Sequence, residues 1–337
     1  MSDNTVESGA KGGIAWGSII KKYSIVLILV GLIILITILT RGVFLRVPNL
    51  LNVVRQVSVI GIIALGVTMV IITAGIDLSS GSLVALVSVV VGSLLQRADA
   101  PARLFEGGQP WPLLLVVVIG LLVGAAGGLI NGSLVAKAKI PAFIATLGMM
   151  TFARGWAFIY SDGRPRGGLE PHFLVIGQGT FLGVPNPVWI LLACVILTHI
   201  ILKHTLWGRY TYAIGSNKNA AIVSGINVDR YTIMVYSYAG FLSAVAAIVL
   251  TARIGSGQPG LGIMYELDAI AASVIGGTSL QGGVGTAAGA LAGALIMGVL
   301  RNGLDLLNVP ADMQQVLRAV IIVVAVIIDV RKNKQKD

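Results

Sequence analysis

The chain has 337 residues, of which 56% are hydrophobic and 11% are charged, and its formal net charge is +10. Ordinary soluble domains carry about 25% charged residues, so this composition argues against a water-soluble protein and favours the lipid bilayer as the solvent. The basic residues punctuate apolar runs and form no single basic face, so the positive charge does not indicate a nucleic-acid partner.

Ten apolar runs are long enough to predict membrane spans. We place these runs at about 24–40, 54–73, 80–96, 112–135, 141–160, 188–203, 231–252, 265–280, 284–300 and 312–330. The run at 265–280 is the least regular, because it carries Glu266 and Asp268 and is separated from the next run by only the turn QGG. It is typical of a broken or re-entrant helix. The pattern predicts an all-α polytopic membrane protein, with one transmembrane domain over residues 24–330.

The lysines predict the orientation of these spans. With the N-terminus inside and ten crossings, every lysine falls on the inner side: Lys11, Lys21, Lys22, Lys137, Lys139, Lys203, Lys218, Lys332, Lys334 and Lys336. Inner loops of membrane proteins are enriched in Lys and Arg; the arginines here are divided between the two sides and decide less. We therefore expect cytoplasmic tails at 1–23 and 331–337.

Two connections are too long to be simple turns. The external loop, about residues 161–187, is rich in Gly and Pro and is a candidate docking or gating element. The internal loop, about residues 204–230, predicts a short helix with Ser216 as N-cap and Gly225 at the C′ position. Its apolar surface of Ala220, Ala221 and Val223 needs a partner.

Glycines recur every four residues in two of the predicted spans, at Gly120, Gly124, Gly128 and Gly132 and at Gly285, Gly289 and Gly293. This spacing leaves one helix face without side chains, so that a neighbouring backbone can approach closely. Similar segments, LINGSLVAKAKIP and LIMGVLRNGLDLLNVP, end both regions. The two spans run in opposite directions, which predicts two inverted five-helix halves. The alternative is that both rows are generic helix packing.

Catalytic motifs are absent from the sequence. No Gly-Lys pair occurs, so there is no GxxxxGK[ST] phosphate loop, and neither HExxH nor GxSxG is present. His172, His199 and His204 are too scattered for a metal site, and Cys194 is the only cysteine. We predict no catalytic residue, no metal and no cofactor in this chain, so that any ATP hydrolysis belongs to another subunit.

Ionisable residues within or beside spans are the usual functional candidates in membrane proteins. Asp77 either caps the helix that follows it or serves as an ion site. Glu266 and Asp268 are either first-turn carboxylates or proton carriers. Arg154 is expected to extend its side chain to the membrane interface.

Several long segments carry a family resemblance. The sequences MYELDAIAASVIGGTSLQGGVGT (264–286), LLNVVRQVSVIGIIALGVTMVIITAGIDLSSGSL (51–83) and GGLINGSLVAKAKIPAFIATLGMMTFARG (127–155) resemble the membrane-spanning permeases of bacterial ABC monosaccharide importers, in the ribose, galactose/methyl-galactoside and xylose branch. The resemblance covers about residues 45–330.

The resemblance implies a multi-pass protein of the bacterial inner membrane with about ten helices. Its implied partners are membrane lipid, a second permease subunit, ATPase subunits that hold ATP-Mg, and an outer sugar-binding protein. The internal loop resembles the segment that couples such permeases to the ATPase, which includes Ser216 and in which Asn219, Ala220, Ala221 and Gly225 occupy the pattern Glu-Ala-Ala, three residues, Gly. The usual glutamate is replaced by Asn219.

A path for a neutral sugar needs hydroxyl and amide groups rather than fixed charges. Polar residues at the mouth of the second span, near the turn after it and in later spans are the candidates for this path: Asn52, Gln56, Thr73, Thr146 and Ser273, with Asp77 beside them. The alternatives are an ion-coupled secondary transporter that uses Asp77, Glu266 or Asp268, and a non-transporting membrane scaffold.

Overall fold

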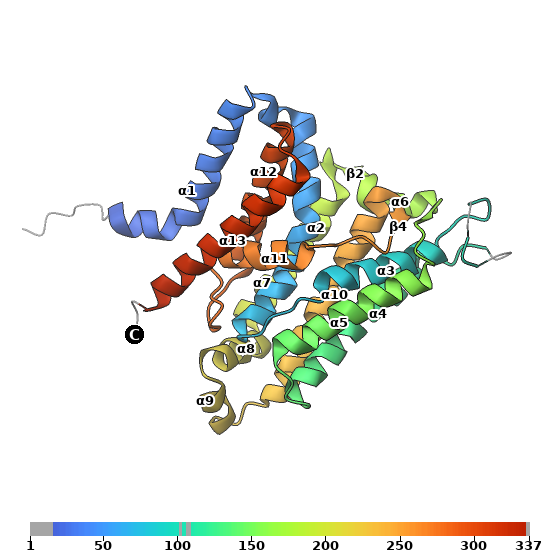
Figure 1. Cartoon of the computed structure of the whole chain (residues 1–337). Helices are drawn as coiled ribbons and strands as arrows, with labels where there is room; N and C mark the ends of the chain where they lie inside the picture. The colour runs from blue at the N-terminus through green and yellow to red at the C-terminus, as the bar shows by residue number, and fades with distance from the viewer. Residues whose placement is uncertain (1–15, 101–102, 106–108, 335–337) are drawn as a thin grey trace, which may run out of the picture.

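The computed structural model describes residues 16–100, 103–105 and 109–334. These residues are mostly helical (Figure 1). The helices are α1 (Trp16–Leu39), η1 (Val43–Leu45), α2 (Val47–Ile72), α3 (Ser80–Leu94), α4 (Leu113–Ala136), α5 (Ala142–Tyr160), α6 (Pro171–Gln178), α7 (Asn186–His204), α8 (Leu206–Ser216), α9 (Lys218–Val223), α10 (Val228–Ile254), α11 (Tyr265–Ile275), α12 (Ala287–Leu306) and α13 (Ala311–Lys334). Two short antiparallel pairs accompany them: β1 (Arg166–Gly167) with β4 (Ser256–Gly257), and β2 (Thr180–Phe181) with β3 (Val184–Pro185).

Six helices in the described part of the chain are long and apolar enough to cross a bilayer, namely α2, α4, α5, α7, α10 and α12. Helix α3 is apolar but has only 15 residues. At 1.5 Å per residue it is about 22 Å long, shorter than a hydrocarbon core of about 30 Å. Helix α1 begins at Trp16, earlier than the predicted span, while residues 1–15 of the predicted N-terminal tail and 335–337 of the C-terminal tail lie outside the described residues.

The predicted span at 265–280 is wrong as a crossing helix. Helix α11 has 11 residues, which gives a length of about 16 Å. The chain leaves the helix at Gly276 and turns through Gly277, Gly282 and Gly283, whose φ angles are 88°, 89° and 72°. These left-handed conformations end a helix and are open to glycine. Figure 1 shows α11 lying across α2 rather than alongside it, so the expectation of a broken or re-entrant segment fits this part of the chain.

The long helices pack in a reciprocal pattern. Helix α10 packs against α3 and α4, and α2 packs in the same way against α11 and α12. Helix α3 also contacts α5, as α11 contacts α13, and α2 and α10 contact each other at the centre. Each of α2 to α5 therefore has a counterpart among α10 to α13 with equivalent neighbours.

The two glycine rows sit in close helix contacts, but they face different partners. On α4, a Cβ added to Gly124 would lie 2.5 Å from the carbonyl oxygen of Gly240 in α10, and one on Gly132 would lie 2.7 Å from the Cα of Ile233. On α12, a Cβ on Gly289 or Gly293 would overlap the backbone carbonyls at the end of α11. Most of the α4 row therefore joins α4 to α10, although Gly120 faces Val91 of α3. Gly289 and Gly293 join α12 to α11, whereas Gly285 precedes α12 and faces Ile72 of α2.

Replacing Gly128 with alanine is expected to destabilise the protein by about 1–3 kcal/mol, as overpacking does in other cores. The new methyl group would overlap the carbonyl oxygen of Tyr236, a backbone atom that cannot rotate away. Thermal unfolding in detergent, followed by size-exclusion chromatography, measures the loss. Gly148→Ala is the matched control, since a Cβ there meets nothing within 4 Å. Equal stability of the two variants would contradict the assigned α4–α10 contact.

Candidate functional site

The predicted internal loop contains two helices, α8 and α9, where the sequence predicts one. Ser216 is the last residue of α8, so its prediction as the N-cap of the second helix is wrong. Asn217 has the extended backbone that a cap requires (φ −159°), and its side-chain oxygen accepts a hydrogen bond of 2.9 Å from the backbone nitrogen of Ala220. Gly225 follows the C-cap Ser224 with φ +80°, the conformation expected at the end of a helix.

Helix α9 presents uncovered apolar side chains. Val223 is 89% exposed and Ile222 is 54% exposed. Asn219 and Ala220 are exposed beside them, whereas Ala221 is buried against Ile214 and Val228 of the same chain. We call the exposed residues Asn219, Ala220, Ile222 and Val223 the α9 surface. Ala221 fixes this helix to its own subunit, and the α9 surface is left free for another protein.

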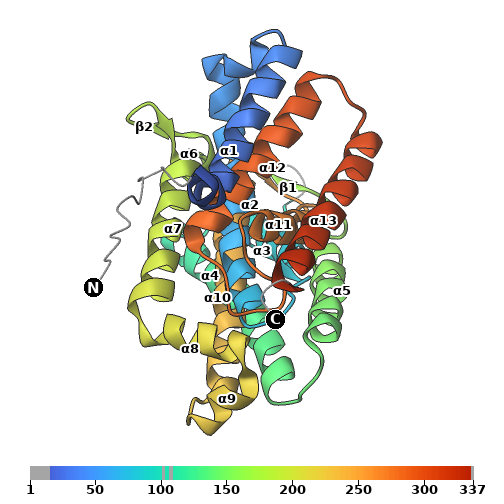
Figure 2. The ribbon, with the colours of Figure 1, turned by 90° about the vertical axis from the view of Figure 1, so that its left-hand side faces the viewer.

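Helix α8 joins the α9 surface to two breaks in the long helices (Figure 2). The hydroxyl of Tyr212 donates a hydrogen bond of 2.7 Å to the carbonyl oxygen of Gly285, in the connection between α11 and α12. Gly215 lies so close to the end of α2 that an added Cβ would overlap the carbonyl oxygen of Ile72. That same oxygen accepts a hydrogen bond of 2.9 Å from Gly283. A displacement of α8 therefore acts directly on α2 and on the α11–α12 connection.

Our sequence-based prediction does not include this contact, because it does not include α8. An available signal is its amphipathic spacing, with Gly208, Thr211 and Ile214 buried on one face.

The break between α2 and α3 holds buried polar groups. Asp77 is 1% exposed, and its Oδ1 atom accepts hydrogen bonds from the backbone nitrogen and the hydroxyl of Ser79, at 2.8 and 2.6 Å. Asn131 of α4 donates to the Ser79 hydroxyl at 2.8 Å, and the Thr146 hydroxyl of α5 donates to the carbonyl oxygen of Ile76 at 3.1 Å. The N-cap of α3 is Ser79, so Asp77 orders the turn before the helix rather than capping it.

The remaining candidates for a path are dispersed. Ser273 is completely buried between α11 and α2, where it accepts a hydrogen bond of 2.9 Å from Thr68. Thr73 donates to the carbonyl oxygen of Val70 at the end of α2. Asn52 is exposed near the start of α2, and Gln56 lines a cavity of about 200 Å³ between α2, α10, α11, α12 and α13. The structure brings Asp77 and Thr146 together near Thr73 at the end of α2. It leaves Ser273, Asn52 and Gln56 apart from them.

The guanidinium of Arg154 is bound by backbone carbonyl groups of another segment. Its Nη1 atom donates to the carbonyl oxygens of Pro259 and Leu261, at 2.7 and 2.6 Å. Both acceptors belong to the connection between α10 and α11, which α5 thereby holds. Glu266 and Asp268 lie in the first turn of α11, one of the two positions expected for them.

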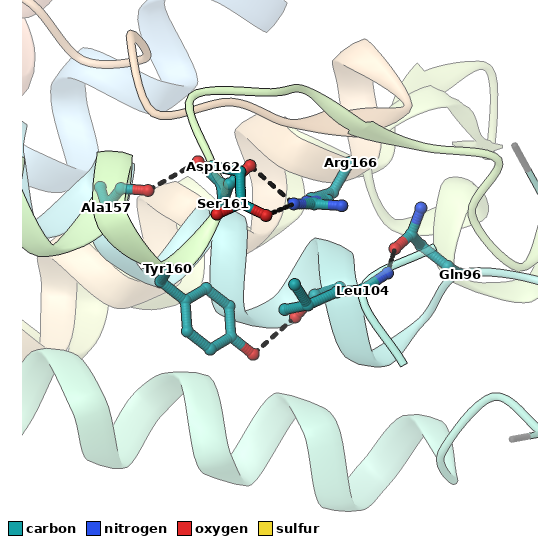
Figure 3. Close-up of polar contacts among 8 residues, drawn as sticks. Gln96, Leu104, Ala157, Tyr160, Ser161, Asp162 and Arg166 are labelled. Carbon is teal, nitrogen blue, oxygen red and sulfur yellow. Dashed lines mark hydrogen bonds and ion pairs between the residues drawn. The ribbon is translucent and has the colours of Figure 1, made fainter. Parts of the chain in front are cut away.

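The predicted external loop is folded against the ends of α3 and α5 (Figure 3). The Nη2 atom of the buried Arg166 donates to the carbonyl oxygen of Ser161 at 2.6 Å and lies 3.7 Å from Oδ2 of Asp162. Gln96, at the end of α3, donates a hydrogen bond of 3.2 Å to the carbonyl oxygen of Gly167 in the loop, and its side-chain oxygen accepts one from the backbone nitrogen of Leu104. Strand β1 of this loop pairs with β4, just after α10. The loop therefore forms an ordered surface at the end of the molecule opposite α9 (Figures 1 and 2).

Comparisons with known proteins agree over nearly the whole chain. Residues 49–326 match the family described as the branched-chain amino acid transport system / permease component. The ribose import permease of Haemophilus influenzae is 45% identical over 306 residues, 89% of this chain and 91% of that protein. That of Escherichia coli K12 is 43% identical over 337 residues, which cover 99% of this chain and 100% of that protein.

Permeases named for other sugars are also similar. The L-arabinose transport system permease of E. coli K12 is 36% identical over 99% of this chain and 98% of its own length. The galactose/methyl galactoside import permease of H. influenzae is 38% identical over 93% and 94% of the two chains. No solved structure gives a significant match. The chain belongs to the family of transport-system permease components, a family of multi-pass membrane transport subunits and not of enzymes.

Proposed function

We propose that the chain is the permease subunit of a bacterial ATP-driven importer and forms the path of a monosaccharide, such as ribose or galactose, across the cytoplasmic membrane. Its sugar-permease relatives match it from end to end, which supports the same task for this chain. The structural observation that carries the proposal is the uncovered α9 surface, connected through α8 to the breaks at Ile72 and Gly285.

We infer that the α9 surface docks into the ATPase subunit, which binds and hydrolyses ATP-Mg. The apolar Ile222 and Val223 and the small Ala220 fit a cleft in a partner, and burial of apolar surface stabilises such contacts. Asn219 stands where the resemblance places a glutamate, so docking relies on shape and apolar contact rather than on an ion pair. Asn217, Ala221 and Gly225 act as the internal support of this surface.

We place both termini in the cytoplasm, with ten crossing or partly crossing segments in two inverted halves. The reciprocal packing of α2 to α5 with α10 to α13 supports the halves. Lys137 and Lys139 after α4, Lys203 at the end of α7 and Lys218 on α9 belong to the end of the molecule that carries α8 and α9 (Figure 1). Lysines concentrate on the cytoplasmic side, so this end faces the ATPase.

The other partners follow from this orientation. A sugar-binding protein docks on the external loop, and a second, identical permease subunit lies alongside in the lipid. Sugar leaves the binding protein past Asn52 and Gln56 at the outer end of α2. Thr73, Thr146 and Asp77 lie by the inner break, and Ser273 joins the path only when α11 moves away from α2. Hydroxyl and amide groups bind a neutral sugar weakly enough to release it.

Vesicle uptake tests the proposed function. The permease, reconstituted with its neighbouring ATPase and loaded binding protein, is expected to accumulate radiolabelled monosaccharide only when ATP is supplied on the ATPase side. Omission of the ATPase is the control. Uptake driven by a proton or sodium gradient without the ATPase would instead establish the chain as a secondary transporter.

A further inference from the structure

One cavity lies between α2 and the consecutive helices α10 to α13, which are far from α2 in the sequence. It has a volume of about 200 Å³ and is bounded by α2, α10, α11, α12 and α13. Ligand pockets for drug-sized molecules are about 300–1,000 Å³. This cavity is smaller than that range and therefore suits a small polar molecule such as one sugar ring.

Three polar side chains of the cavity wall form no hydrogen bond to another described residue. Among the described residues, the side chains of Gln56, Arg253 and Tyr265 form no hydrogen bond, although all three line the cavity. They offer a guanidinium, an amide and a hydroxyl, which together donate and accept hydrogen bonds. All three side chains are only partly buried, so their polar groups are open to water or to a polar ligand that enters the cavity.

The charges of the wall are balanced, which selects the class of ligand. Arg253 and Arg301 are matched by Asp268 and Asp305, and Nη1 of Arg301 lies 4.0 Å from Oδ2 of Asp268. Neither an anion nor a cation gains net attraction from equal numbers of opposite charges. A polyhydroxyl compound does gain, since each hydroxyl donates to a carboxylate while it accepts from a guanidinium. The apolar Leu250 and Met297 lie on the same wall, along with Ile60, Ala294 and Leu300.

The cavity is at the outer end of the proposed topology. Gln56 is in the first half of α2, and Arg253 and Arg301 are near the ends of α10 and α12. These helix ends point away from α8 and α9 (Figure 1). From the size, the polar groups without hydrogen bonds, the balanced charges and this position, we propose that each subunit holds a receiving site for one monosaccharide in this cavity, which Gln56 joins to the outer end of the proposed path. The identity of the ligand rests on the proposed function.

Direct binding to the permease alone tests the site. Wild-type permease in nanodiscs, without ATPase or binding protein, is titrated with ribose, arabinose and galactose, and binding is followed by saturation-transfer NMR. We expect at least one of these sugars to bind and maltose, a disaccharide, to fail. Arg253→Met is expected to raise the dissociation constant about tenfold or more, as loss of a hydrogen bond to a charged group does. Gln56→Leu, which removes an uncharged group, is expected to raise it severalfold.

Arg41→Met is the matched control, since Arg41 is exposed at the end of α1 and does not line the cavity; its dissociation constant should equal that of the wild type. If size-exclusion chromatography shows that Arg253→Met does not fold, the dissociation constant of Gln56→Leu alone tests the receiving site. Unchanged affinity in the folded cavity variants, equal binding of maltose, or no binding of any monosaccharide overturns the receiving site. ATP-driven uptake by the complete wild-type importer is measured separately. Absence of this uptake contradicts the proposed function. If uptake is present but the cavity variants bind sugar with unchanged affinity, only the receiving site is contradicted.

Discussion

Val223→Asp is expected to weaken assembly with the ATPase by at least about tenfold while the permease stays folded. The side chain is 89% exposed, so the isolated subunit loses no internal packing. Full burial of a valine contributes about 1.5–3 kcal/mol, and about 1.4 kcal/mol corresponds to tenfold in affinity. The carboxylate adds the cost of desolvating a charge that has no partner. Affinity of the purified permease for the ATPase, measured by biolayer interferometry, gives the result.

Leu182→Asp is the matched control for this measurement. Leu182 lies in the turn between β2 and β3, at the opposite end of the molecule, and is 79% exposed. Its φ angle is +53°, a conformation that aspartate tolerates better than most residues. The control adds the same charge to a comparably exposed apolar site. An equal loss of ATPase binding in both variants would refute the α9 surface as the docking site.

Most crossing helices were predictable because the bilayer imposes their length. The six helices that are long and apolar enough to span, α2, α4, α5, α7, α10 and α12, all coincide with predicted runs. The run at 265–280 is apolar enough on average to predict a span, but the average hydropathy does not reveal that α11 ends at Gly276. An apolar segment of this composition can form either a short helix or a longer span. Here the left-handed turn through Gly277 ends the helix after 11 residues.

The polar contacts of the site were less predictable because they join distant parts of the chain. Arg154 finds its acceptors at Pro259 and Leu261, carbonyl groups that any residue supplies and that leave no trace in the sequence. The cavity wall likewise combines Gln56 with Arg253 and Arg301 through the packing of α2, α10 and α12. The Asn217 cap illustrates a smaller error, since Ser216 and Asn217 are both good cap residues and only the end of α8 decides between them.

Gly215→Leu is expected to lower ATP-driven uptake by more than about tenfold while leaving the α9 surface able to bind the ATPase. A side chain at this position would overlap the carbonyl oxygen of Ile72 and approach the nitrogen of Gly283 to 2.6 Å at its Cβ. Overlap with backbone atoms is relieved only when the backbone moves, so α8 must shift away from the end of α2. ATPase binding and sugar uptake, measured on the same reconstituted complex, separate docking from transmission.

A pair of hydroxyl deletions on α8 distinguishes this transmission from a general loss of packing. Tyr212→Phe removes only the 2.7 Å hydrogen bond to the carbonyl oxygen of Gly285. Because such a bond contributes a net free energy of about 1 kcal/mol, we expect a severalfold fall in the amount of sugar imported per ATP hydrolysed. Tyr210 packs on Tyr231 with ring centroids 4.8 Å apart, and its hydroxyl forms no hydrogen bond to a described residue. Tyr210→Phe should therefore retain full coupling. The proposed role of α8 is contradicted if all three variants, Tyr212→Phe, Tyr210→Phe and Gly215→Leu, import as much sugar per ATP hydrolysed as the wild type. In that case α8 does not transmit motion to the α11–α12 connection, and the motion of the ATPase reaches the path by another route.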